Sequence, residues 1–321
     1  MESFSKVLLL VNPLAGGGRG RYWAPLLEEA LKRKGLSVHC QLLEPYEDLN
    51  RVIEECSADL ILVAAGDGTF HKVINAWING EKRPPLSLIP IGTGNVFAAN
   101  MGIPMRPLEA LEALLKGQIR RLDLGSVDGQ LFHSTLGVGF DAYVVHKIEE
   151  GSPNHRFKRI FGALTYIFEA LRHMRHYQWS QVHLKALLSD GSSQTWDRNS
   201  WLILINNMAA YAGGFRVTPD ARPDDGLLDL CVLPAQKKTD YLLFAFLGLL
   251  GLHLRHPDVL YEQIRQVSIT AERPLPSQLD GERGPQTPLT AQVIPSALPV
   301  LLPATPIAPH ATPIPVSESL A

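Results

Sequence analysis

The sequence has few cysteines, almost no net charge and no long apolar run, and each shortage excludes a class of protein. Its 321 residues include three cysteines, Cys40, Cys56 and Cys231, too few and too widely spaced for a disulfide framework or a structural zinc site. The formal net charge of −2 comes from 30 basic and 32 acidic residues, so the chain exerts no general attraction on DNA or RNA. We therefore expect a protein of the reducing cytoplasm that does not bind nucleic acid.

Apolar runs are present but short. The run near the N-terminus leads directly into a Pro/Gly turn after Asn12, without the small-residue cleavage site of a signal peptide, so it is predicted to be the first strand. The longest later run, Tyr241 to Leu254, is shorter than the roughly 18 to 20 residues that cross a bilayer. Such a segment can touch a membrane surface without spanning it.

The first part of the chain alternates strand-like and helix-like segments. Apolar runs lie at 6–12, 59–66 and 85–95, and segments with helical spacing lie at 21–35 and 69–80. Strands that are apolar on both faces and alternate with helices predict a parallel sheet covered on both sides. The second part, from about Gly125, is rich in strands and includes a hairpin through Asp190-Gly191. The predicted fold class is α/β in two domains, an N-terminal Rossmann-like parallel sheet and a C-terminal β-sandwich.

Three of the predicted strands end in glycine-rich turns, at 11–20, 64–70 and 91–98. Glycine lets main-chain N–H groups approach an anion closely, and the helix start that follows adds the positive end of its dipole. Any one such turn is by itself more often an ordinary tight turn, but three at corresponding strand ends favour a nucleotide site. Neither a Walker-type motif nor a G-x-G-x-x-G fingerprint occurs, which disfavours a dehydrogenase.

These turns, together with later motifs, resemble the catalytic domain of diacylglycerol kinases and the bacterial YegS-like lipid kinases. The early motifs are Asn12-Pro13, Gly66-Asp67-Gly68-Thr69 and Gly92-Thr93-Gly94-Asn95 with Phe97-Ala98. The later motifs, in the family's order, are Gly137 to Ala142, Tyr211 to Leu230, Gln278 to Glu282 and Val293 to Pro303. Gly-Asp-Gly-Thr alone is shared with NAD kinases and phosphofructokinases, so it indicates only a kinase superfamily. The later acidic motifs narrow that superfamily to the lipid kinases. The resemblance covers about residues 5 to 303.

The resemblance implies an ATP-dependent lipid kinase that transfers the γ-phosphate to the hydroxyl of a diacylglycerol-like or sphingoid lipid alcohol. It also implies which residues bind ATP: Asn12, Ala65, Gly66, Asp67, Gly68, Thr69, Phe70, His71, Gly92, Thr93, Gly94 and Asn95. Because a carboxylate such as Asp67 would repel a polyphosphate, we expect Mg²⁺ nearby.

The resemblance places a second metal site in the later part of the chain. Its ligands would be the Asp225 carboxylate and the backbone carbonyls of Arg222 and Leu227, with Asp224 and Asp229 as alternative ligands. Without the family context, the same segment is an acidic β-turn before a strand.

The general base is implied in the same way. Asp280 would accept the proton of the lipid hydroxyl, and Glu282 would orient or share that proton. Asp67 is the alternative base. Taken locally, the segment around Asp280 is a solvated Asp-Gly hairpin turn.

Three positions depart from the family's pattern. Lys72 stands where relatives usually carry a glutamate, Ala65 replaces a glycine, and Leu43 stands where a threonine is common. The lysine removes any metal contact made by that glutamate, although its ammonium group could contact phosphate or Asp67. A catalytically weak relative that binds nucleotide or lipid is therefore the second hypothesis, and a NAD kinase-like enzyme is the third.

We expect a nucleotide-binding domain over 1–124, a β-rich lipid-binding domain over 125–303 whose last strand could return to the first domain, and a disordered Pro-rich tail over 304–321. A helical segment at 156–179 alternates basic and apolar residues, which fits either core packing or docking on anionic lipid. The expected partners are the lipid alcohol and, transiently, the inner face of the membrane. The sequence does not decide between a monomer and a homodimer.

Overall fold

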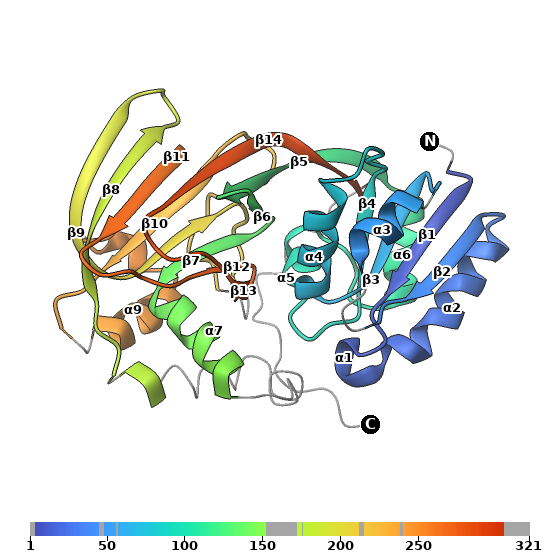
Figure 1. Cartoon of the computed structure of the whole chain (residues 1–321), viewed down its shortest axis with the longest axis horizontal. Coiled ribbons are helices and arrows are strands. Elements are labelled where there is room, and N and C mark those ends of the chain that lie inside the picture. The colour runs from blue at the N-terminus through green and yellow to red at the C-terminus, as the bar shows by residue number, and fades with distance from the viewer. Residues whose placement is uncertain are drawn as a thin grey trace. The chain divides into compact units, whose positions relative to one another are not determined.

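A computed structural model of the chain describes residues 4–44, 48–55, 57–151, 172–174, 176–211, 215–237 and 240–304 (Figure 1). The described chain forms two compact units. One comprises the residues up to Leu122 together with those from Ala297 on, and the other comprises Asp123–Ser296. The helix expected at 156–179 falls largely outside the described residues, as does the expected Pro-rich tail.

The first unit is built on a parallel sheet. Its strands lie in the order β2-β1-β3-β4, and the end of β14 pairs with β4 through Val300 and Leu86. The strands are β1 (Lys6–Val11), β2 (Ser37–Leu42), β3 (Leu60–Ala65), β4 (Leu86–Pro90) and β14 (Leu289–Leu302). Every residue of β3 and β4 is buried, as expected for strands covered on both faces.

Helices follow these strands in alternation, as the sequence predicts. They are α1 (Ala15–Gly18), α2 (Gly20–Arg33), α3 (Leu49–Glu55), α4 (Asp67–Trp77), α5 (Val96–Asn100) and α6 (Pro107–Leu115). In α2 the buried residues include Ala24, Leu27 and Leu31, whose spacing of three and four residues puts them on one face of the helix. The glycine-rich turns therefore follow β1, β3 and β4 and lead into α2, α4 and α5. The turn after β1 contains the short α1, in which Gly16 and Gly17 are left-handed (φ 58° and 77°).

The second unit is an antiparallel β-structure with α7 and α9 on it (Figure 1). Neighbouring strands follow the order β13-β12-β7-β9-β10-β11-β14, and β8 pairs with both β9 and β11. The elements are β5 (Gln118–Val127), β6 (Gln130–Phe132), β7 (Thr135–Gly139), α7 (Phe140–Gly151), β8 (Ser180–Leu188), β9 (Ser193–Asn206), β10 (Leu228–Pro234), α9 (Asp240–Leu249), η2 (His253–Arg255), β11 (Leu260–Ala271), β12 (Ser277–Leu279) and β13 (Glu282–Arg283). The predicted hairpin at Asp190-Gly191 joins β8 to β9.

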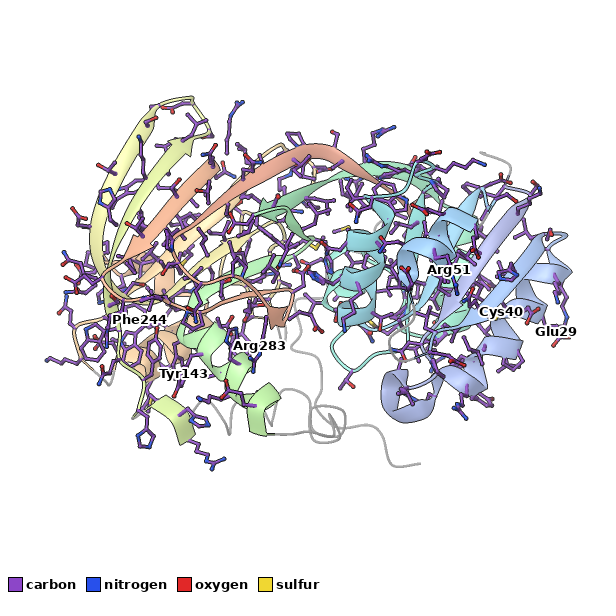
Figure 2. All side chains as sticks on the ribbon, in the orientation of Figure 1. Glu29, Cys40, Arg51, Tyr143, Phe244 and Arg283 are labelled. Atoms are coloured by element: carbon purple, nitrogen blue, oxygen red, sulfur yellow. The ribbon has the colours of Figure 1, made fainter. Side chains whose placement is uncertain are left out.

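The core of the second unit lies between its strands. Buried and more exposed residues alternate along β8, so one face of that strand packs inward. The side chains that meet there come from several strands and include Val182, Ile203, Leu230 and Val267. A separate aromatic cluster joins α7 to β9, where the rings of Phe140 and Trp201 lie 5.8 Å apart between centroids. Figure 2 shows the side chains of both units.

Candidate functional site

Three glycine-rich turns meet at the carboxyl ends of β1, β3 and β4. The turns after β3 and β4 approach so closely that a Cβ atom on Gly92 would lie 2.5 Å from the Cα of Gly66. The turns after β1 and β3 are joined by a hydrogen bond of 2.8 Å, which the Asn12 Nδ2 group donates to Thr69 Oγ1. Because glycine has no side chain, the backbones can lie in contact at this edge of the sheet. The arrangement predicted from the three strand ends is present.

Helix starts contribute to the same edge. Gly66 precedes α4 in an extended conformation (φ −105°, ψ 177°), and α4 begins at Asp67 with no side-chain cap at its N-terminus. Helix α2 begins in the turn after β1, at Gly20. A helix N-terminus presents backbone N–H groups and the positive end of the helix dipole, and both attract phosphate. Two helices of 11 and 14 residues therefore start at the edge where the turns meet.

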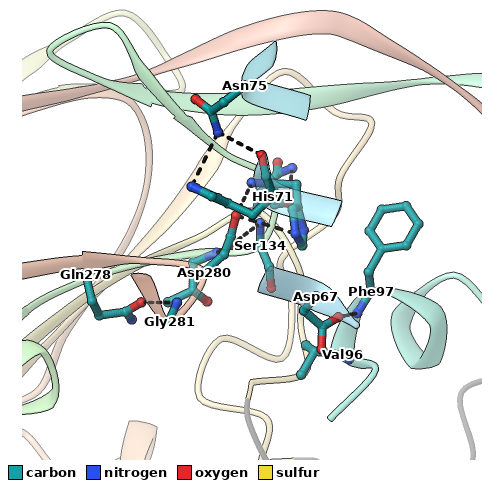
Figure 3. A network of polar contacts seen from close by, with 12 residues as sticks. Asp67, His71, Asn75, Val96, Phe97, Ser134, Gln278, Asp280 and Gly281 are labelled. Atoms are coloured by element: carbon teal, nitrogen blue, oxygen red, sulfur yellow. Dashed lines mark hydrogen bonds and ion pairs between the residues drawn. The ribbon is translucent and has the colours of Figure 1, made fainter. Parts of the chain in front are cut away.

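Asp67 has a structural role that the sequence did not reveal. Its Oδ2 accepts a hydrogen bond from the Val96 backbone N–H and its Oδ1 accepts one from Phe97, each at 3.0 Å (Figure 3). The carboxylate therefore caps the N-terminus of α5 and ties the turn after β3 to the turn after β4. We expected Asp67 beside a phosphate-bridging cation, whereas both of its oxygens already face main-chain donors.

Replacing Asp67 with alanine should loosen the turn after β4, because α5 would lose two charge-assisted hydrogen bonds. We expect a loss of about 2 kcal/mol in the free energy of unfolding and a fall of roughly tenfold in ATP affinity. Calorimetric ATP titration and thermal unfolding measure both quantities.

The matched control for that change is Asp59→Ala. Asp59 also accepts backbone hydrogen bonds in the first unit, from Ser5 and Lys6, but it precedes β3, at the opposite edge of the sheet from the glycine turns. ATP affinity should therefore be unchanged in the control. Equal losses of affinity in both variants would show that Asp67 acts on general stability alone.

Some of the other predicted nucleotide residues shape or support the turns, and the rest lie on the turns themselves or on α4. Asn95 adopts a left-handed conformation (φ 49°), and its Nδ2 donates to the Gly92 carbonyl at 2.8 Å, so it shapes the turn after β4. Phe70 is fully buried and packs on Phe97, with ring centroids 4.6 Å apart. Ala65 is buried in β3. Phe70 and Ala65 can therefore serve a ligand through their backbone and by supporting the turns, and their side chains belong to the core.

The remaining members lie on the turns and on α4. The His71 carbonyl accepts a hydrogen bond of 3.0 Å from Asn75 Nδ2, one helical turn later (Figure 3). A Cβ atom on Gly94 would lie 3.2 Å from Asp67 Oδ2, so Gly94 leaves the space that the Asp67 cap occupies. Gly68 and Thr69 form the first turn of α4.

In the second unit, Asp280 lies in the hairpin turn between β12 and β13 but is not solvated. The turn residues Asp280 (φ 50°) and Gly281 (φ 86°) are left-handed, as an Asp-Gly hairpin requires. The Asp280 side chain is 1% exposed. Its carboxylate accepts hydrogen bonds of 2.9 Å from the backbone N–H groups of His133, Ser134 and Thr135 (Figure 3). The predicted Asp-Gly hairpin turn is therefore present, but the prediction that it is solvated is wrong, because three backbone donors from a distant segment bury its carboxylate.

Hydrogen bonds through Gln278 link the Asp280 turn to Asp141. The Gly281 N–H donates to Gln278 Oε1 at 2.6 Å (Figure 3), and Gln278 Nε2 donates to Asp141 Oδ2 at 2.8 Å. Asp141 and Gln278 are each 1% exposed. Sequence reasoning did not single out Asp141, although a carboxylate directly after the apolar glycine-rich strand at 135–140 was a signal for it. Glu282 begins β13, two residues after Asp280.

Several carboxylates lie close enough to interact in and around the acidic turn that precedes β10, at 220–227. The pKa of Asp225 is raised, mainly by burial and also by the charges of Asp123 and Asp224. Burial likewise raises the pKa of Asp229 to about 6, and the charges of Asp225 and Asp220 add to it. Mutual repulsion of this kind is relieved when a cation binds among the carboxylates.

The residues of this turn fit a hard cation. Asp225 Oδ1 accepts the Leu227 N–H at 3.0 Å, and the turn carries carboxylate and carbonyl oxygens, the type of ligand that Mg²⁺ prefers. Within the described part of the chain, no group of three or more His, Cys, Asp or Glu side chains stands ready to hold a metal ion. A site here would depend on carbonyl oxygens as much as on carboxylates.

Asp123 organises this turn and was missed from the sequence. It is 2% exposed; its Oδ2 accepts the Gly226 N–H and its Oδ1 accepts the Ser296 N–H, each at 2.7 Å. Its own N–H donates to the Pro223 carbonyl at 2.6 Å. The available signal was one aspartate between Leu122 and Leu124 in a strand-like segment.

Comparison with known families accounts for most of the chain. The family model of the diacylglycerol kinase catalytic domain matches residues 6–127. The family model of the YegS C-terminal NAD kinase beta sandwich-like domain matches residues 134–302. The second match confirms the predicted β-sandwich, and the two together agree with the predicted resemblance.

Individual relatives and solved structures agree with these matches. A diacylglycerol kinase of Bacillus subtilis is 28% identical over 232 residues, which cover 72% of this chain and 73% of the relative. A Pseudomonas aeruginosa protein named "Probable lipid kinase YegS-like" is 32% identical over 260 residues, or 80% of this chain and 82% of the relative. The crystal structure of a diacylglycerol kinase from Bacillus anthracis superposes with a TM-score of 0.75 at 25% identity, over 94% of this chain and 98% of that one.

Proposed function

We propose that this chain, which belongs to the diacylglycerol kinase catalytic-domain family of lipid kinases, transfers the γ-phosphate of ATP to the hydroxyl of a lipid alcohol. Membership of the family makes it a phosphotransferase that acts on a lipid alcohol. The observation that supports the proposal best is the meeting of three glycine turns and two helix starts at one sheet edge. Backbone N–H groups gathered in this way suit a triphosphate.

Each turn has a distinct part in holding the triphosphate. Gly66 and Gly68 offer backbone N–H groups, and Thr69 offers a hydroxyl, at the start of α4; the Thr69 N–H itself donates to the Gly66 carbonyl at 3.1 Å. Asn12 orients that hydroxyl through its hydrogen bond to Thr69 Oγ1. Asp67 holds the turn at 92–95 in place through α5. Positioning and electrostatic stabilisation are what phosphoryl transfer chiefly requires of a protein.

Asp280 is the proposed general base. As the lipid oxygen forms its bond to the γ-phosphorus and the bond to ADP breaks, the hydroxyl proton passes to the Asp280 carboxylate. Three backbone N–H groups hold that carboxylate and stabilise its negative charge. Because this carboxylate is held in place, its main role would be to orient the attacking hydroxyl. That role suits phosphoryl transfer, in which the bond to the lipid oxygen forms later than the bond to ADP breaks. Asp141 and Gln278 act as positioning residues for this turn.

Magnesium would be held in the second unit by the Asp225 carboxylate and the carbonyls of Arg222 and Leu227. When bound there, Mg²⁺ supplies positive charge that neutralises the acidic turn. Asp123 would position this turn through the Gly226 N–H.

The metal assignment predicts a change in thermal stability. Adding about 5 mM Mg²⁺ should raise the melting temperature of the wild-type protein by a few degrees, because a ligand that binds only the folded state stabilises it. Asp225→Asn should lose most of this increase, because the amide brings no charge to the site. Differential scanning fluorimetry with and without Mg²⁺ measures both.

Asp224→Asn is the control for the metal assignment. Asp224 lies in the same turn and faces Arg222 at 3.9 Å, so the Mg²⁺ response of this variant should equal that of the wild type. Loss of the response in Asp224→Asn but not in Asp225→Asn would move the ligand role to Asp224.

A transfer assay tests the function itself. Purified protein is incubated with γ-labelled ATP, Mg²⁺ and mixed micelles that contain, one at a time, diacylglycerol, a sphingoid base, ceramide or phosphatidylglycerol. We expect label in the lipid phase for one of these classes. If the protein binds ATP but labels none of them, the binding-only alternative, to which the Lys72 replacement points, replaces the present proposal.

A further inference from the structure

Helix α9 presents apolar side chains to solvent. Leu242, Leu243 and Phe246 of α9, together with Leu250 directly after its end, are here called the α9 patch and are 47%, 44%, 59% and 54% exposed. At about 100° per residue these four positions project within an arc of about 100°. Phe244 lies on the other face of the helix: it is 5% exposed and packs edge-on against the His256 ring, with centroids 5.1 Å apart.

The helix is thus apolar on its packed face and on its outward face. A surface helix of a globular protein usually carries polar residues outward, because water solvates that face. A contiguous apolar patch on the surface marks a site of interaction with another surface. The α9 patch is therefore a candidate contact surface.

Exposed cations precede and follow α9 in the sequence, and both carboxylates near it accept hydrogen bonds. The sequence of α9 contains one charged residue, Asp240, whose Oδ2 accepts the backbone N–H groups of Gln236 and Lys237 at 2.7 Å. Asp258, near the same end, accepts a hydrogen bond of 3.2 Å from the Gln236 side chain. Lys237 precedes the helix in the sequence and Arg255 follows it, and both are exposed, as is Asp258. Apolar residues flanked by cations are typical of helices that lie in the interface of an anionic bilayer.

The size of the patch disfavours a second copy as its occupant. Four side chains about half exposed offer roughly 400 Å², since a large apolar side chain buries roughly 150 to 250 Å². Stable interfaces bury at least roughly 600 Å² on each partner. A bilayer imposes no such minimum, because the gain from each inserted side chain adds to electrostatic attraction.

We propose that the α9 patch inserts shallowly into the surface of an anionic bilayer and holds the enzyme where its acceptor resides. The inference rests on the proposed function in one respect, that the acceptor is a membrane lipid. Among the described residues no helix combines the length and apolar character needed to cross a membrane, so the contact is one of insertion at the surface.

Vesicle sedimentation without ATP tests the proposal separately from catalysis. The probes are phosphatidylcholine vesicles with and without about 30% phosphatidylglycerol, a content that gives the surface its negative potential. We expect Leu243→Ser/Phe246→Ser to bind the anionic vesicles at least tenfold more weakly than the wild type. The matched control is Met105→Ser/Leu108→Ser, which removes two apolar residues of similar exposure, 46% and 40%, from the first unit. It should bind as the wild type does.

Further readouts separate this proposal from the proposed function. With a short-chain diacylglycerol dissolved as monomers, turnover of the α9 variant should stay within about twofold of the wild type. Absence of turnover in the wild type would refute the proposed function and leave the vesicle result standing. Unchanged vesicle binding of the α9 variant, or an equal loss in the control, would overturn the α9 proposal. So would a wild-type dimer, seen by light scattering, that the α9 substitutions convert to monomer.

Discussion

Asp280→Asn is expected to lower turnover by about a thousandfold while leaving ATP affinity within a few fold of the wild type. The change removes the oxygen that would take the hydroxyl proton, and general base catalysis contributes roughly 10² to 10⁴ in rate. ATP affinity should persist because the proposed phosphate donors belong to the other unit, at the turns after β1, β3 and β4. Steady-state transfer of labelled phosphate and calorimetric ATP titration measure the two effects.

The chain offers a matched control in Asp128→Asn. Asp128 and Gly129 form the hairpin turn between β5 and β6 with nearly the same backbone angles, φ 48° and 84°. Asp128 is exposed, so the same substitution in the same kind of turn should leave turnover unchanged. Wild-type turnover in Asp280→Asn would remove Asp280 from the mechanism.

A second variant guards against a folding defect. The new amide of Asp280→Asn turns an N–H group toward one of the backbone donors at 133–135, which destabilises the turn. Asp280→Ser removes the carboxylate without adding an amide donor. We expect the same loss of turnover in both variants, with melting temperatures that differ. A loss that followed melting temperature instead would indicate a structural role.

Gly92→Ala is expected to lower ATP affinity at least tenfold. The added methyl would lie 2.5 Å from the Gly66 Cα and 2.8 Å from Asn95 Oδ1, so the turns after β3 and β4 would have to separate. Overpacking of this kind costs about 1 to 3 kcal/mol, and the displaced backbone N–H groups would no longer converge on the phosphates. ATP titration with thermal unfolding as a parallel readout tests this.

Gly248→Ala controls for the general effect of adding a methyl group. A Cβ atom at Gly248 would meet no heavy atom within 4 Å, so ATP affinity should be unchanged in this variant. If Gly92→Ala bound ATP as tightly as the control does, the close approach of the two turns would have no part in holding the nucleotide.

The parts of the site that the sequence predicts are those set by neighbouring residues. A fully apolar β3 followed at once by Gly66 indicates both the buried strand and the bare backbone at its end. Parallel order then brings the turns together, because consecutive strand ends share one edge of the sheet. The Asp190-Gly191 hairpin follows from turn residues between two alternating segments in the same way.

The parts that the sequence does not predict depend on distant partners. The surroundings of the Asp280 carboxylate are set by N–H groups 145 to 147 residues earlier, so the local pattern could not distinguish a solvated carboxylate from a buried one. Asp67 is similar, because its partners Val96 and Phe97 lie 29 and 30 residues later. Asp123 and Asp141 are detectable only as charges in apolar surroundings, which indicates burial but not the donor that each one binds.

The most direct test of the account is a crystal structure of the protein with a non-hydrolysable ATP analogue, Mg²⁺ and a short-chain lipid alcohol. We predict that the triphosphate contacts backbone N–H groups of the turns at 66–69 and 92–95, and that the acceptor hydroxyl lies within hydrogen-bond distance of the Asp280 carboxylate. An analogue bound away from these turns, or a ternary complex in which Asp280 does not contact the acceptor, would contradict the account.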